Sequence, residues 1–369
     1  MNVLSFSMVY LVPVTVYLGY WLGGIYTFTT PFLIFGVGPL LDSILGRYTR
    51  NPSEETEKEL EADGRYKMLT IFCVPIQLAV VFWGAWVVSF GDLTILEQVG
   101  VTFSVGISSD VLGLSAAHEL AHRVNEKFEL TLSKILYGSV LYIHFGLEHV
   151  VGHHRRVATP EDPATARLGE SVYAFLPRSV FGGFNSAWEF EAGRMKQQNQ
   201  PVWSMRNPMV VALMAPTALM VLIAAVFGGI GVVYFLAQSF IAIILVEIAN
   251  YVVHYGLMRK EIAPGKYEPV RPWHSWNSSN WLSNHFLFNI QRHSDHHYKP
   301  GRRYQTLRHY DEVPQLPTGY AGMIVLAAIP PLWRKIMDPR VLKFRKQQKK
   351  EGEDEKKNTT DGNGVQLNS

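Results

Sequence analysis

The sequence predicts an all-α integral membrane protein, with a bundle of six transmembrane helices and a histidine-rich domain on its cytoplasmic side. Among its 369 residues, 48% are hydrophobic and 18% are charged, which is too apolar for an ordinary soluble enzyme of this length. Six apolar stretches are about long enough to cross roughly 30 Å of hydrocarbon as helices. Nine of the thirteen histidines fall into four compact clusters, each of which follows an apolar segment.

Basic residues set the expected orientation of these helices. The predicted spans are 4–24, 26–46, 68–90, 98–117, 209–228 and 231–253. Lys and Arg crowd the loops after the second, fourth and sixth spans, whereas the three other turns hold none. Because basic loops stay in the cytoplasm, we expect three hairpins with both termini cytoplasmic; the family resemblance described below implies the inner membrane of a bacterium. No basic residue precedes the first span and no cleavage pattern follows it, so we expect it to be retained.

Three further segments complete the predicted organisation. The apolar pieces 130–147 and 319–332 are too short or interrupted to span comfortably, and we expect both at the membrane interface. The chain from residue 343 is polar, charged and without periodicity, which predicts disorder. The sequence therefore predicts one membrane-embedded domain over 1–342 and a disordered tail over 343–369.

Composition excludes several classes of protein. Cys73 is the single cysteine, so the chain can form neither an internal disulfide nor a cysteine-ligated metal centre. The net charge of +3 is small and the basic residues follow no single face, which argues against nucleic-acid binding. The chain has no CxxC pair and no dinucleotide-binding fingerprint, so redox chemistry would need a separate electron carrier.

The histidine clusters are the candidate functional site. They contain His118 and His122; His149, His153 and His154; His254; and His293, His296 and His297. In three clusters the spacing of three to five residues brings imidazoles onto one face of a helix. Such a face can chelate a metal ion.

Membrane topology determines whether the clusters can meet. If 130–147 crossed the bilayer, the second cluster would lie on the side opposite the first. With that segment at the interface, all the clusters, within 118–154 and 254–312, share the cytoplasmic side. Nine imidazoles exceed the coordination of one ion, which predicts a di-metal domain. Imidazole suits iron, copper, zinc and nickel, so the ligands leave the element open.

Two other functions share some of these features. Residues 118–122 read HELAH, the HExxH signature of zinc proteases, in which Glu119 would act as general base. That interpretation leaves seven clustered histidines unexplained. A metal transporter would place its ligands near the middle of the membrane, whereas these clusters flank the spans or lie beyond them.

The chain resembles the integral-membrane alkane 1-monooxygenases, also called alkane ω-hydroxylases, in four motifs: HELAHR, EHVVGHHRRVATPEDPATAR, NYVVHYGL and NIQRHSDHHYKPGRRYQTLRHY. The resemblance runs from about residue 36 to 342, and it is specific because the four motifs recur in order. Membrane desaturases and fatty-acid hydroxylases share the HxxxH and HxxHH patterns but lack NYVVHYGL and QRHSDHH in this form.

The resemblance implies a non-haem di-iron monooxygenase that inserts one oxygen atom of O2 into the terminal C–H bond of linear alkanes, giving 1-alkanols. The nine clustered histidines would bind two iron ions, and no further catalytic residue is implied. Electrons would come from rubredoxin, reduced by an NAD(P)H-dependent rubredoxin reductase. The alternative is a related membrane di-iron enzyme, either a hydroxylase of fatty acids or aromatic methyl groups or a desaturase.

Polar residues near the clusters are candidates for orienting the metal-binding imidazoles. These residues are Asp110, Asp162, Glu247 and Asn250. Helix packing or loop capping would explain them equally well. Four other histidines lack partner spacing and are interpreted as ordinary polar residues: His144, His274, His285 and His309. The alternative for His144 and His274 is that they line the pocket.

Two further sets of residues are expected by analogy and by charge. Phe32, Phe35 and Leu40 in the second span are expected to line a substrate tunnel. Five arginines flank the second and last histidine motifs and are expected to form a basic docking site for an acidic carrier: Arg155, Arg156, Arg302, Arg303 and Arg308. Alternatively, they pair with nearby carboxylates, such as Glu161, Asp162, Asp311 and Glu312, or with anionic lipid.

Overall fold

The computed structural model describes residues 2–362, with side chains up to residue 348. The first part contains α1 (Val3–Phe6), η1 (Ser7–Tyr10), α2 (Leu11–Leu22), η2 (Gly24–Phe28), α3 (Thr29–Pro31), η3 (Phe32–Val37), α4 (Gly38–Leu45), α5 (Glu54–Ala62), α6 (Gly64–Phe90), α7 (Ile95–Ser108), η4 (Ser109–Leu114) and α8 (Ser115–Ala121). The second part contains α9 (Lys127–Gly138), α10 (Ile143–Glu148), η5 (His149–His153), α11 (His154–Arg156), α12 (Val172–Gln197), α13 (Pro208–Val253), β1 (Glu261–Ala263), β2 (Lys266–Tyr267), η6 (Pro272–His274), α14 (Trp281–Phe286), α15 (His293–Tyr298), η7 (Tyr304–Thr306), α16 (Tyr320–Ala327) and α17 (Pro330–Gly362). Only the β1–β2 hairpin forms a sheet in the described chain, so the all-α prediction is confirmed.

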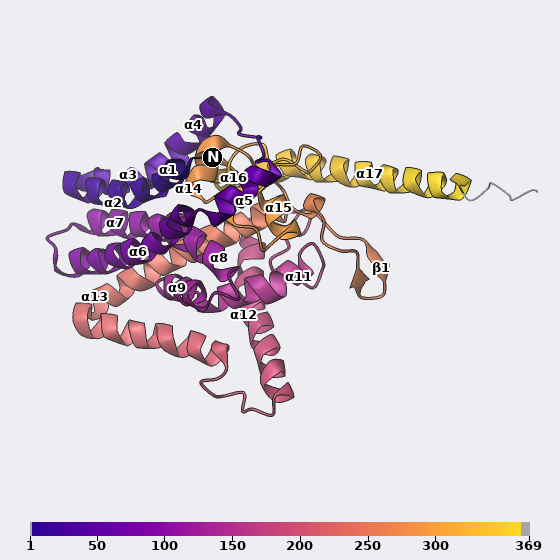
Figure 1. Ribbon diagram of the computed structural model, residues 1–369. Coiled ribbons are helices and arrows are strands. Elements are labelled where there is room, and N and C mark those ends of the chain that lie inside the picture. Colours follow the sequence, from indigo (N-terminus) through magenta and orange to yellow (C-terminus); the bar gives the residue numbers. More distant parts are fainter. Residues whose placement is uncertain (1, 363–369) are drawn as a thin grey trace, which may run out of the picture.

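Five helical segments of the described chain are long and apolar enough to cross a membrane: Val3–Leu22, Gly24–Leu45, Gly64–Phe90, Ile95–Ala121 and Pro208–Val253. The protein is therefore a multi-pass membrane protein. The fifth segment, α13, contains both of the last two predicted spans. Gly228 has φ 67° and ψ −166°, a conformation open to glycine but not to other residues, and α13 bends there into two arms (Figure 1).

The turn between the first and second apolar segments is hydrogen-bonded to the turn between the third and fourth, at one end of the bundle. Thr94 caps α7, and its hydroxyl and backbone N–H both donate to Glu97. The other carboxylate oxygen of Glu97 accepts from the backbone N–H of Gly24, at 2.7 Å, in the turn between α2 and η2. This contact joins two hairpins at the end of the bundle away from the histidine motifs.

The predicted interfacial segments and tail differ in outcome. Residues 130–147 are divided between α9 and α10, and 319–332 between α16 and the start of α17, so neither forms a membrane-long helix in the described chain. The prediction of disorder from residue 343 is wrong for 343–362, because α17 continues to Gly362. Lys, Glu and Gln favour helix there, and Arg345 donates to the carbonyl of Gly256 at 2.8 Å. Residues 363–369 lie outside the described residues.

A polar network in the core fixes the helices that carry the histidines. The side chain of Gln77 on α6 donates to Ser109 on η4 at 2.8 Å, and Ser109 donates to Gln238 on α13 at 3.0 Å. All three side chains are buried among apolar neighbours such as Ile107 and Leu112. Such bonds link helices because a buried polar group without a partner is costly. The histidine-bearing elements α8, α11 and α15 lie in the same region of the ribbon (Figure 1).

Candidate metal centre

Five separate elements bring the nine clustered histidines together. His118 lies on α8 and His122 follows that helix. His149 and His153 lie on η5, a π-helical turn, and His154 begins α11. His254 caps the end of α13, and α15 carries His293, His296 and His297. The fold therefore brings imidazoles from five separate parts of the sequence into two groups.

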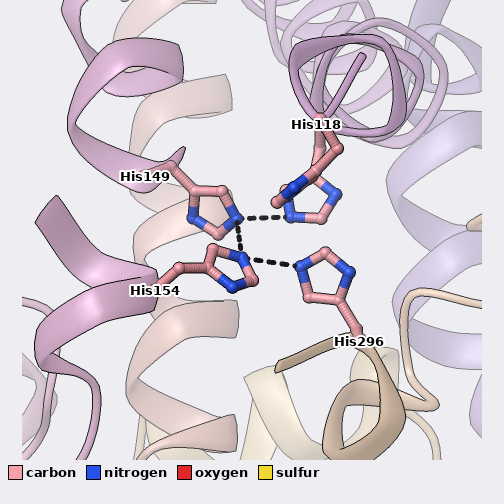
Figure 2. A group of neighbouring side chains, drawn as sticks. His118, His149, His154 and His296 are labelled. Atoms are coloured by element: carbon pink, nitrogen blue, oxygen red, sulfur yellow. Dashed lines mark hydrogen bonds between the residues drawn. The ribbon is translucent and has the colours of Figure 1, made fainter. Parts of the chain in front are cut away.

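The first group contains His118, His122, His149, His154 and His296. Their imidazoles point toward one another, as Figure 2 shows for four of them. The Nε2 atoms of His118 and His149 are 2.7 Å apart, and the Nε2 atom of His154 is 3.0 Å from those of both His149 and His296. The Nε2 atom of His122 is buried with no hydrogen-bond partner.

The second group contains His153, His254, His293 and His297, and all four side chains are buried. Their Nε2 atoms also face one another. The Nε2 atom of His254 is 3.1 Å from those of both His153 and His293, and the Nε2 atoms of His293 and His297 are 2.9 Å apart. The two groups adjoin, because the rings of His154 and His297 stack with their centroids 4.2 Å apart.

These nitrogens fit a pair of metal ions better than they fit a hydrogen-bond network. A neutral imidazole has one N–H, so Nε2 atoms that face several other Nε2 atoms cannot all be paired with a donor. No carboxylate lies within either group. Two cations, one within five and one within four imidazoles, would satisfy these lone pairs. The two groups therefore have the donor set of a metal site built from histidine.

Burial keeps these imidazoles in the state that binds metal. It lowers the pKa of His293 to about 3, and together with neighbouring histidines it lowers the pKa values of His149, His154 and His296 far below the usual range. A histidine must be neutral to offer its lone pair to a cation. The ring nitrogens of these four histidines are therefore available to metal throughout the neutral pH range.

Asp162 is the predicted orienting residue that contacts a clustered histidine. Its carboxylate accepts from Nδ1 of His153 at 2.9 Å, and also from the hydroxyl of Thr165 at 2.6 Å and the backbone N–H of Ala164 at 3.1 Å. Burial alone would lower the pKa of His153, but the Asp162 carboxylate raises it above its usual value. Because Asp162 engages Nδ1, it directs Nε2 of His153 toward the second group.

The other three predicted orienting residues lie elsewhere. Glu247 accepts from Tyr142 at 2.7 Å and from Ser179 at 2.5 Å, so its hydrogen bonds in the described structure go to neighbouring helices and not to a histidine. Asp110 and Asn250 lie on the wall of a cavity. Neither residue has a hydrogen bond to a clustered histidine among the described residues, so neither is shown to orient a ring.

An apolar cavity of about 370 Å³ adjoins both histidine groups. His118 and His149 of the first group and His293 of the second lie on its wall. Most of the remaining wall is aliphatic or aromatic, and it includes Leu33, Ile34, Phe35, Val37, Leu41, Val111, Leu114, Val246, Phe286 and Ile324. Its volume is in the range of sites that enclose a small ligand. A hydrocarbon could therefore approach both metal positions in a space that excludes water.

One of the three predicted tunnel residues lines the cavity in the structure. Phe35 lies on the cavity wall. Phe32 and Leu40 are 66% and 65% exposed and are not among the residues that line this cavity. Residues 32–37 form a π-helical turn, which shifts the face that an α-helical spacing would predict. The residues that the sequence missed in this segment include Ile34 and Leu41, whose spacing of seven matches an inward face.

Four of the five candidate docking arginines are held in ion pairs. The pairs are Arg156–Glu148, Arg302–Glu57, Arg302–Asp295, Arg303–Glu129 and Arg308–Glu57. These carboxylates differ from the neighbours that the sequence suggested. Arg155 is exposed and has no ion pair in the described structure. The expected basic dock is therefore largely neutralised, and Arg155 is its remaining free charge.

Two acidic residues inside the histidine motifs have structural partners. Glu119 pairs with Arg123 at 2.7 Å, which occupies the carboxylate that a zinc protease would use as general base. Asp295 is fully buried and accepts from Arg302, from the hydroxyl of Tyr310 at 2.7 Å and from the backbone N–H of Arg308 at 2.8 Å. Asp295 thus anchors α15, a role that its position between two ligand candidates did not reveal.

The four remaining histidines lie outside both groups. His274 contacts Glu268 at 3.3 Å, His285 contacts the carbonyl of Trp281 at 2.7 Å, and His309 contacts Ser279 at 2.8 Å. His144 packs against Tyr142 and Phe184, and its Nε2 atom is buried with no partner. None of the four lines the apolar cavity.

Comparisons with known proteins agree with this site. A family model described as fatty acid desaturase matches residues 98–327. The chain is 44% identical to alkane 1-monooxygenase 2 of Pseudomonas aeruginosa over an alignment of 332 residues, which covers 88% of each of the two chains. Over 317 residues it is 40% identical to the alkane 1-monooxygenase of Acinetobacter baylyi, covering 86% of this chain and 77% of that protein. It is also 30% identical, over 241 residues, to the xylene/toluene monooxygenase hydroxylase component XylM of Pseudomonas putida, covering 64% and 63% of the two chains.

Proposed function

The chain belongs to the alkane 1-monooxygenase family, and from that membership we propose that it is a di-iron enzyme that hydroxylates the terminal carbon of linear alkanes. The observation that carries the proposal is the apolar cavity that adjoins both histidine groups. A linear alkane has no polar group to recognise, so only the shape and the apolar walls of the cavity can select it.

We propose that the nine clustered histidines are the iron ligands, five to one ion and four to the other. Two bound iron ions would supply the reduction of O2 and the insertion of one oxygen atom into a C–H bond. Asp162 would hold His153 in the orientation that its ion requires. The arginine pairs of Asp295 and Glu119 would hold α15 and α8 at fixed positions.

The cavity wall would orient the substrate. An alkane dissolves in the hydrocarbon of the bilayer, so a cavity among apolar helices draws it from the phase where it is concentrated. Its walls would hold the chain extended, with one methyl group beside His118, His149 and His293. The same walls keep bulk water from the reacting carbon.

Each turnover needs two electrons that the chain does not carry. We propose that rubredoxin supplies them, after reduction by an NAD(P)H-dependent rubredoxin reductase. The protein would lie in a bacterial inner membrane with both termini and both histidine groups on the cytoplasmic side, where that carrier is found. The basic loops next to the histidine motifs support this orientation.

Product analysis tests the function. Purified protein in lipid nanodiscs, given reduced rubredoxin, heavy-isotope O2 and n-octane, n-dodecane or n-hexadecane, should form 1-alkanols carrying one heavy oxygen atom. Hydroxylation at internal carbons, or a hydroxyl oxygen that comes from water, would contradict the proposed reaction.

Phe35 is expected to limit the length of alkane that fits. The Phe35→Ala variant should shift the product profile toward longer 1-alkanols, because removing the ring vacates space on the cavity wall. Phe32→Ala is the matched control, since that ring lies on the same turn and is 66% exposed. The measurement is the yield of each 1-alkanol from an equimolar alkane mixture. Equal shifts in both variants, or no shift in either, would exclude Phe35 from length selection.

Arg155 is expected to contribute to docking of the electron carrier. The Arg155→Glu variant should raise the KM for reduced rubredoxin by about threefold at low salt, because an acidic carrier would then meet a like charge. The difference should shrink at high ionic strength, where screening shortens the range of the interaction. Arg206→Glu, an exposed residue in the loop before α13, serves as the control. A salt-independent KM that is equal in both variants would exclude Arg155 from docking.

A further inference from the structure

Asp110 is a carboxyl group on the wall of an otherwise mostly apolar cavity. It lies on η4, within the membrane-long segment Ile95–Ala121, and lines the same cavity as His118. In the part of the chain that the structure describes, it makes no hydrogen bond and no ion pair. An unpaired acidic group inside a membrane span is unfavourable and usually serves a function. Its partner would have to come from what the cavity holds.

The position of Asp110 places it far from the metal end of the cavity. It stands eight residues before His118 in a helical run that begins with the π-helical segment η4, so the two residues are about two turns apart. Leu114 and Ser115 lie on the cavity wall between the two. Ser115 donates its hydroxyl to the carbonyl of Val111, so it offers no hydrogen-bonded path from Asp110 to the histidines. Asp110 is therefore placed neither to orient a ligand nor to pass a proton to one.

A second polar group lies nearer the metal end. Asn250 lines the cavity one helical turn before His254, and its side chain also interacts with the Glu247 carboxyl on the same helix. Between Asn250 and Asp110 the wall is formed by residues such as Val111, Leu114 and Val246. An apolar cavity whose wall carries one carboxyl group without a partner among the described residues matches an alkyl chain that carries a polar group at one end.

We propose that Asp110 binds the hydroxyl group of a primary alkanol whose far methyl group lies at the metal centre, so that the protein also converts 1-alkanols into terminal diols. This inference rests on the proposed function for its chemistry. The alkanol, O2, two electrons from the carrier and two protons give the diol and one water. The far C–H bond and the O–O bond break, and one C–O bond forms.

Equilibrium binding tests the role of Asp110 without turnover. Labelled 1-decanol and n-decane are bound to the protein in nanodiscs, under argon and without an electron donor. The Asp110→Leu variant should bind 1-decanol about tenfold more weakly than wild type and n-decane no more weakly, because only the alkanol loses a hydrogen bond. Asp110→Asn should retain alkanol binding, since an amide can still pair with a hydroxyl. Asp92→Asn, at an exposed turn, controls for a general effect of charge.

Product ratios then test the activity. Given equal amounts of the two substrates, wild type should form the terminal diol from 1-decanol, and Asp110→Leu should lower that rate about tenfold relative to n-decane hydroxylation. Metal content should be the same in both proteins. Equal alkanol binding in wild type and Asp110→Leu would overturn the proposal, as would wild type that hydroxylates n-decane but forms no diol. Wild type that hydroxylates neither substrate while binding 1-decanol through Asp110 would instead refute the proposed function.

Discussion

The His254→Ala variant is expected to bind about one metal ion fewer per chain than wild type and to lose nearly all alkane hydroxylation. His254 is buried at the end of α13, and its Nε2 atom faces those of both His153 and His293 at 3.1 Å. The second group has four imidazoles, so removing one leaves fewer ligands than a stable site usually has. Activity should fall well beyond the roughly 10- to 100-fold loss that follows removal of a ligand's hydrogen-bond partner.

Two further histidine variants serve as comparisons for His254→Ala. His122→Ala should lower metal content less, because four imidazoles of the first group remain. His285→Ala should leave metal content unchanged, since His285 is equally buried but contacts a backbone carbonyl outside both groups. The measurement is metal per chain by mass spectrometry together with the rate of 1-alkanol formation. A His254→Ala protein that keeps full metal content and full turnover would remove His254 from the ligand set.

The Asp162→Ala variant is expected to lower metal affinity and turnover by about 10- to 100-fold. The Asp162 carboxylate holds Nδ1 of His153 at 2.9 Å, which keeps Nε2 directed into the second group. Burial would raise the pKa of Asp162, but His153 and the hydroxyl of Thr165 hold it below its usual value, so the group stays ionised at neutral pH. Without it, the His153 ring can rotate and Nδ1 loses its partner.

Variants at and beside this position separate charge from hydrogen bonding. Asp162→Asn should retain part of the affinity, because its amide oxygen can still accept from Nδ1 of His153. Glu161→Gln, at the neighbouring exposed residue, should match wild type. The measurement is the free iron concentration at which half of the protein is loaded. Equal loading curves for Asp162→Ala and Glu161→Gln would show that Asp162 does not support the metal site.

The sequence was sufficient to predict the nine clustered histidines, but it could not divide them into two groups. His153 and His154 are adjacent yet belong to different groups. The adjacent residues His296 and His297 are divided between the groups in the same way. Neighbouring residues on a helix point about 100° apart, so each HH pair serves both metal positions. Spacing along the chain shows which rings share a helical face, whereas the assignment of each ring depends on how five distant elements pack.

Contacts between distant residues and local helix geometry account for the differences between the sequence-based expectations and the structure. Arg302 pairs with Glu57, which lies 245 residues away, so its neutralisation could not be inferred from neighbouring carboxylates. The outward position of Phe32 follows from a π-helical turn that apolar composition does not reveal. The helical continuation of α17 past residue 343 depends in part on Arg345 meeting Gly256. In none of these three cases does the order of apolar and charged residues along the sequence reveal the outcome.

The number and kind of metal ions in the wild-type protein test the central claim most directly. Protein purified without oxygen and loaded with iron(II) would be analysed for iron, zinc and copper per chain, with the His254→Ala protein measured alongside. Two histidine groups predict two iron ions per wild-type chain, with alkane hydroxylation that rises with iron content. A chain that holds one zinc ion, and hydroxylates no alkane after loading with iron, would contradict the di-iron assignment.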